Sequence, residues 1–174
     1  MQDVILTIVG TDRPGLVESL AAVVADAGGN WLESRMAHLA GVFAGILRVQ
    51  APRDTVPRLV AAIEALARND LKVVVERGTE PAARGPQRRL VLELVGLDRA
   101  GIVRDLSRVL ASHGANIEEI VTDSSSAPMS GELIFRAHLR LHVPEAADLG
   151  HLRADLERVA TDLMVEVHLS DTTT

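Results

Sequence analysis

The chain repeats itself: shifting its 174 residues by 86 places aligns the segment 10–30 with the segment 96–116. Ten of these 21 aligned positions are identical, and they include loop glycines, an Asp-Arg pair and a closing Asn. Chance similarity between two helices would not preserve such loop residues. We therefore predict two homologous modules of about 80 residues each, over 1–77 and 89–170, joined by a Pro- and Gly-rich linker over 78–88.

Each module has the same predicted order of elements. In the first, a β-branched run over 4–9 is typical of a buried strand, and an amphipathic helix follows until Gly28-Gly29 ends it. Asp12 is expected to cap this helix, as Asp98 does before the helix near 100–113. Thr55 is expected to cap the second helix. The other expected strands cover residues 30–39, 42–50, 71–76, 90–95, 116–123, 132–143 and 164–169.

This βαββαβ order, present twice, predicts an α+β fold. Right-handed crossovers place the four strands of such a unit in one antiparallel sheet with both helices on one face, the ferredoxin-like arrangement. Each sheet then keeps one uncovered face. The strand from Leu133 to Val143 has the matching alternation, with apolar residues on one side and Arg136, His138 and Arg140 on the other.

Composition and charge disfavour several classes of function. Eighteen basic and 24 acidic residues give a net charge of −6, which repels nucleic-acid phosphates and anionic lipids. One Trp and two Phe leave almost nothing for base stacking on an open sheet. The absence of Cys excludes disulfides and thiolate zinc sites. No apolar run of about 20 residues and no basic leader are found, so a cytoplasmic location is expected.

Enzymatic chemistry has weak support. The sequence has no nucleophile-elbow serine and no phosphate-binding Gly-Lys-Ser/Thr loop, so no catalytic residue and no cofactor is expected. His138 and His142 share a strand face but lie roughly 13 Å apart, too far for one metal ion. The remaining enzymatic alternative is an acylphosphatase-like hydrolase that would use Arg13 for phosphate and Asn30 to position water.

The repeated loop carries a resemblance to a known family. Gly10-x-Asp-Arg-Pro-Gly15 after the first strand, followed by a helix and Gly28-Gly29-Asn30, resembles an ACT domain. Both copies match, and a tandem pair without a catalytic domain is similar to the glycine cleavage system transcriptional repressor family. The resemblance implies a sensor of glycine or a related small amino acid, acting through a partner transcription factor. A regulatory subunit of a metabolic enzyme is the alternative.

The strand-to-helix loops are the candidate ligand sites. A helix N-terminus offers backbone N–H groups to a carboxylate, and a loop glycine lets the ligand approach. An Asn carbonyl can accept from the ligand ammonium. The candidate ligand residues are Asp12, Arg13, Gly15, Leu16 and Asn30 in the first module and Asp98, Arg99, Gly101, Ile102 and Asn116 in the second.

Each loop is separated from the Asn of its own module by a helix. About 14 helical residues span about 20 Å, too far for one amino acid to touch both ends. The ACT resemblance implies composite sites between paired modules. We therefore expect Asn30 to face the 98–102 loop and Asn116 to face the 12–16 loop, between two modules of one chain or of a homodimer.

Structural explanations of the same residues remain open at this point. Asp12 and Asp98 could serve only as helix caps, the two arginines could be solvated, and each Asn could simply follow a glycine stop. The second module also has a longer polar hairpin loop, expected over Ser124–Ser130. This loop is either a lid or docking element, or a mobile connection of no function.

Overall fold

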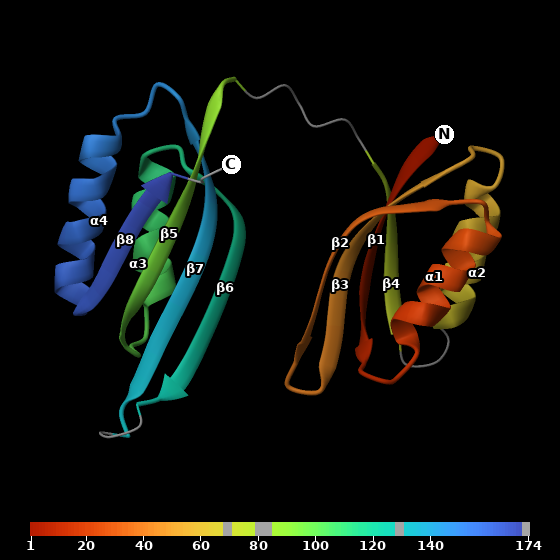
Figure 1. Cartoon of the computed structure of the whole chain (residues 1–174), viewed down its shortest axis with the longest axis horizontal. Coiled ribbons are helices and arrows are strands. Elements are labelled where there is room, and N and C mark those ends of the chain that lie inside the picture. Colours follow the sequence, from red (N-terminus) through yellow and green to blue (C-terminus); the bar gives the residue numbers. More distant parts are fainter. Residues whose placement is uncertain (68–70, 79–84, 128–130, 172–174) are drawn as a thin grey trace. The chain divides into compact units, whose positions relative to one another are not determined.

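The computed structural model describes residues 1–67, 71–78, 85–127 and 131–171. The chain divides into two compact units, Met1–Pro81 and Ala82–Thr174 (Figure 1). The first unit contains β1 (Gln2–Thr11), α1 (Leu16–Asp26), β2 (Asn30–Leu39), β3 (Val42–Ala51), α2 (Val56–Ala67) and β4 (Leu71–Arg77). The second contains β5 (Gln87–Leu97), α3 (Ile102–Ser112), β6 (Asn116–Ser126), β7 (Leu133–Pro144), α4 (Leu149–Leu163) and β8 (Val165–Asp171).

Each unit has one four-stranded sheet. The strand orders are β2-β3-β1-β4 and β6-β7-β5-β8, and every neighbouring pair is antiparallel. Both helices of a unit lie on the same face of its sheet (Figure 1). The predicted α+β fold with two ferredoxin-like units is therefore confirmed. No helix among the described residues is long and apolar enough to cross a membrane.

The helix-covered face of each sheet forms a separate core. In β1, Val4, Leu6 and Ile8 are buried while the residues between them are not, as the strand period of two requires. The buried residues of the two cores have no member in common. The predicted alternation along β7 is also confirmed, except that Leu133 at its start is 51% exposed.

The first helix of each unit starts later than the sequence predicts. α1 follows Gly15, whose φ is 82°, and α3 follows Gly101, whose φ is 100°; neither helix has a side-chain cap hydrogen bond. The prediction that Asp12 and Asp98 cap these helices is therefore wrong. A left-handed glycine makes the turn from strand to helix, and each Asp lies three residues before it.

Two other predictions differ from the structure: the cap of α2 and the start of the loop after β6. Thr55 directly precedes α2, but its hydroxyl donates to the carbonyl of Pro52 at 3.0 Å instead of accepting from the helix. β6 continues to Ser126, so the first three residues of the predicted Ser124–Ser130 loop belong to the strand and pair with β7. Residues 128–130 lie outside the described part of the chain.

The two helices of the second unit are joined by a polar contact. His113, which ends α3 and is 17% exposed, lies with its Nε2 2.9 Å from Oδ2 of Asp155 on α4. This hydrogen bond, together with the charge of Arg158, holds the pKa of Asp155 below its usual value. His113 therefore joins α3 to α4 through a specific partner.

Replacing Asp155 by Asn tests this contact through its pH dependence. A lowered folded pKa means that the carboxylate stabilises the fold above the unfolded pKa, about 3.9, and that this contribution is lost as the pH falls through the folded value. We expect Asp155→Asn to be less stable than the wild type in urea at pH 6, and the difference to shrink below pH 4. A stability difference that stays constant with pH would contradict this role.

Candidate functional site

The loop after β1 is hydrogen-bonded to the β2–β3 hairpin. The Asp12 amide donates to the Gly41 carbonyl at 3.4 Å, and the Asp12 carboxylate lies 3.9 Å from Nε2 of His38. Ala40 and Gly41, with φ of 49° and 84°, form the tight turn that the sequence predicts. The Asp12 side chain thus faces the hairpin, and Arg13 beside it is exposed.

The loop after β5 has the same attachment with different groups. The Asp98 amide donates to the Leu133 carbonyl at 2.8 Å, and the Asp98 carboxylate accepts from Oγ of Ser124 at 3.1 Å. Ser124 is the repeat counterpart of His38. Arg99 donates to the carbonyl of Leu163 at the end of α4, at 3.4 Å.

Both loops end at a helix N-terminus that offers backbone donors. The amides of Ser19 and Asp105 make the first bonds of the α-helical pattern, to the carbonyls of Gly15 and Gly101, each at 2.9 Å. The amide of Leu16 donates to the carbonyl of Arg13 at 3.4 Å, and the other amides of this first turn make no bond of the α-helical pattern and point along the helix axis, which suits an anion. Two predicted ligand residues, Leu16 and Ile102, have side chains buried in the cores, so only their backbone groups could reach a ligand.

A charged side chain distinguishes the two helix N-termini. A Cβ added to Gly15 would lie 3.7 Å from the carboxylate oxygen Oε2 of Glu18. A Cβ added to Gly101 would lie 3.1 Å from the guanidinium nitrogen Nη2 of Arg104, which also binds Asp105. The first loop therefore has a carboxylate beside its glycine, and the second has a guanidinium.

Asn30 lies at the opposite end of its sheet, in the same row as an acidic group two strands away. It begins β2 and pairs with Gln50 of β3, which pairs with Asp3 of β1. Asp3 accepts from Nε of Arg48 at 2.8 Å and from Nε2 of Gln50 at 3.2 Å. These hydrogen bonds, that of Arg48 first, hold the pKa of Asp3 below its usual value, so its carboxylate is charged at neutral pH.

The corresponding end of the second sheet has basic groups. Asn116 pairs with His142 of β7, which pairs with Arg89 of β5. The Nε2 of His142 lies 3.3 Å from the carboxylate of Glu118. Arg89 thus occupies the position that Asp3 occupies in the first unit.

The strand register separates each loop from the Asn of the same unit. In the first sheet, Thr11 pairs with Val42 and Asp3 pairs with Gln50, so the loop after β1 and Asn30 lie at opposite ends. Eight strand residues separate these ends by about 27 Å. The expectation that one small ligand cannot touch both is confirmed. Arg13 and Asn30 are separated in the same way, so the first unit does not assemble the acylphosphatase-like site.

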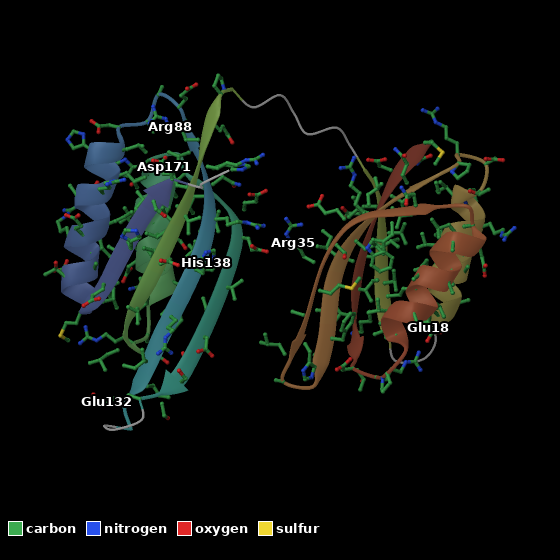
Figure 2. The ribbon with its side chains drawn as sticks, in the orientation of Figure 1. Glu18, Arg35, Arg88, Glu132, His138 and Asp171 are labelled. Carbon is green, nitrogen blue, oxygen red and sulfur yellow. The ribbon has the colours of Figure 1, made fainter. Side chains whose placement is uncertain are left out.

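The second sheet has a hollow that the sequence did not predict. A cavity of about 720 Å³ lies on the face away from the helices, beside Glu93, Arg136 and His138 (His138 is labelled in Figure 2). Its other polar lining residues include Asp123, Glu166 and His168. Within the ranges that the structure describes, no group of three or more His, Asp or Glu residues has the geometry of a metal site.

Sequence comparison places the chain among known proteins. The family model of the ACT domain matches residues 2–76 and 88–170. The glycine cleavage system transcriptional repressor of Escherichia coli (strain K12) is 26% identical over an alignment of 163 residues that covers 91% of this chain and 84% of that protein. Phosphoserine phosphatase SerB2 of Mycobacterium tuberculosis (strain ATCC 25618 / H37Rv) is 27% identical over an alignment of 175 residues that covers 97% of this chain and 40% of that protein.

Structural comparison agrees with the family match. The crystal structure of an unknown protein from Galdieria sulphuraria superposes with a TM-score of 0.88 at 28% identity and covers 99% of both chains. The two sequence matches to the ACT model coincide with the two ferredoxin-like sheets. The chain therefore belongs to the ACT domain family, with two ACT domains in tandem, and is related to the glycine cleavage system transcriptional repressor.

Proposed function

We propose that this protein is a non-catalytic cytoplasmic regulator that binds glycine or a closely related small amino acid and signals to a partner transcription factor. Its relation to the glycine cleavage system repressor supports a role in glycine and one-carbon metabolism. The net charge of −6 disfavours direct contact with DNA, so we infer that a partner protein contacts the promoter.

The observation that carries this proposal is the difference in charge between the 98–102 loop of the second unit and the Asn30 end of the first. A zwitterionic amino acid needs donors for its carboxylate and acceptors for its ammonium. The loop at Gly101 offers helix amides and Arg104, and the sheet end at Asn30 offers the Asn carbonyl and the Asp3 carboxylate. Together these groups complement both charges of the ligand.

The reverse combination has the wrong charges at both ends. The loop at Gly15 has the Glu18 carboxylate where the ligand carboxylate would bind, and the sheet end at Asn116 has Arg89 where the ammonium would bind. We therefore propose that only the composite of the 98–102 loop and the Asn30 end accepts an amino acid. Because these ends belong to different units, a second module must supply one of them, from the same chain or from another copy.

Binding would act through linkage. A ligand that contacts two modules favours the relative orientation in which both contacts are made. A partner protein that prefers this orientation binds more tightly when the amino acid is present, and the amino acid binds more tightly when the partner is present.

Thermal unfolding with a panel of ligands tests the function. The purified protein is melted with each of the twenty amino acids and with folate-pathway metabolites. A ligand at ten times its Kd should raise the free energy of unfolding by about 1.4 kcal/mol. The expected result is a shift with glycine or a close relative, and a panel without any shift would contradict amino-acid sensing.

Substituting the two Asn residues tests the assignment of the site. Asn30→Ala removes an acceptor for a charged donor, worth about 1.5–3 kcal/mol, so we expect affinity for the amino acid to fall about 10- to 100-fold. Asn116→Ala is the matched control and should leave the affinity within about twofold. Titration calorimetry measures both. Loss confined to the Asn116 variant would reverse the assignment, and equal losses would contradict a single site.

One comparison favours a second candidate function. The match to phosphoserine phosphatase SerB2 covers 97% of this chain but only 40% of that protein, which thus joins a similar pair of domains to a larger remainder. We propose, as the alternative, that this chain regulates a separate metabolic enzyme. Affinity capture with the ligand present separates the two: recovery of a DNA-binding protein supports transcriptional control, and recovery of a metabolic enzyme supports the alternative.

A further inference from the structure

The uncovered face of the first sheet, on the side away from α1 and α2, is apolar at its centre. Large side chains on this face have high exposed fractions: Val9 39%, Leu39 74%, Val42 44%, Ile46 49% and Val74 56%. The register brings them together, because Thr7 of β1 pairs with Ile46 on one side and with Val74 on the other. Charged residues border these apolar side chains: Arg35, labelled in Figure 2, lies on the edge strand β2, and Arg48 lies two residues beyond Ile46 on β3.

This apolar surface is not a requirement of the fold. The second sheet has the same strand order, yet its central row has Glu93, His138 and His168 where the first has Thr7, Ile46 and Val74. Both sheets fold with their helices on the other face. Exposed apolar side chains gathered on one face are typical of an interaction surface.

We propose that the uncovered face of the first sheet binds the same face of a second copy of this chain, around a twofold axis that crosses the strands over Thr7, Ile46 and Val74. This axis is perpendicular to the strands, so each strand packs against the same strand of the second copy, which runs in the opposite direction. Ile46 then meets the partner's Ile46, and Val74 meets the partner's Val74, as an isologous interface requires.

The charges of β4 select this axis. Lys72 and Glu76 lie on the uncovered face, two residues before and after Val74. Reversal of the strand puts Lys72 opposite the partner's Glu76, and the second copy repeats the pair. An axis parallel to the strands would instead put Glu76 of β4 opposite the partner's Glu33 of β2, a repulsive contact. The proposed axis also places Arg35 of β2, which pairs with Ile46, opposite the partner's Arg35, and each guanidinium keeps its ion pair with Glu33 of its own chain at 2.6 Å.

The second sheet of the chain is a poor occupant for the same surface. Covering an apolar face with Glu93, His138 and His168 would remove these groups from water without compensating hydrogen bonds. Four strands by eight residues give a face of roughly 500 Å², smaller than the roughly 800 Å² per partner of a standard interface. The expected dimer is therefore weak, with a dissociation constant in the micromolar range. It does not depend on the proposed ligand.

Sedimentation equilibrium of the full chain from about 1 to 200 µM, a range chosen for micromolar affinity, tests the proposal. The wild type should dimerise within this range. Lys72→Glu and Glu76→Lys should each weaken the dimer at least about tenfold, because each places like charges opposite one another. The double variant Lys72→Glu/Glu76→Lys should restore it, which is specific to this axis.

Two further variants locate the face. Val74→Lys should abolish the dimer, whereas Val121→Lys, at an exposed position on the uncovered face of the second sheet, should leave it intact. Thermal melts should show all variants folded, because the substituted side chains are exposed. A wild type that stays monomeric, a double variant that is not restored, or a dimer broken by Val121→Lys would each overturn the proposal.

Discussion

Replacing Gly96 by Val is expected to destabilise the second unit by about 3 kcal/mol or more. Gly96 of β5 pairs with Val165 of β8. A Cβ at position 96 would lie 2.6 Å from Cγ1 of Val165 and 2.7 Å from its Cα. The backbone of β8 can escape this contact only by moving away from β5, which breaks ladder hydrogen bonds at the end of the central strand.

Hydrogen exchange followed by mass spectrometry measures this effect separately in each unit. Peptides from β5 and β8 should lose protection in Gly96→Val, while peptides from β1 and β3 should not. Gly85→Val is the matched control, because a Cβ at position 85 meets nothing within 4 Å. Equal stability of the two variants would show that β8 accommodates the side chain and that the close approach is dispensable.

The fold could be predicted almost entirely from local patterns. The repeat, the alternation along β7 and the glycine stop at Gly28 depend on neighbours within a few residues, and the structure confirms them. The helix starts could not be predicted in this way. Asp12 has the preferred residue type for a cap, but the left-handed Gly15 decides where the turn occurs.

The candidate site could be predicted only in part. The helix length correctly separates Gly15 from Asn30 within one unit, because this needs only the rise per residue. The neighbouring charges were missed. Asp3 and Asn30 are far apart in sequence and share one row of the sheet, on either side of Gln50, through the register of β1, β3 and β2, which the sequence alone does not determine. The same repeat alignment that pairs Glu18 with Arg104 could have revealed the difference between the loops.

Substitution of one equivalent leucine in each core should unfold one unit at a time. Leu6 and Leu92 occupy the same position of the repeat, and each is 0% exposed. Leu6→Ala and Leu92→Ala should each lower the stability of their own unit by about 2–5 kcal/mol, from lost burial and the cavity left behind. Because the two cores share no buried residue, the other unit should keep its exchange protection. A loss spread over both units would show that they unfold together.

This pair of variants also tests whether the amino-acid site needs two modules. The Leu6→Ala variant is studied at a urea concentration at which hydrogen exchange shows that the first unit is unfolded and the second is folded. Under these conditions the 98–102 loop remains folded, but the Asn30 end of the first sheet is lost. Binding of the amino acid should then disappear, as it should in Leu92→Ala, where the loop itself is lost. Wild-type protein in the same urea is the control. Binding retained by Leu6→Ala would place the whole site within the second unit and contradict a composite site, because no part of the first would be needed.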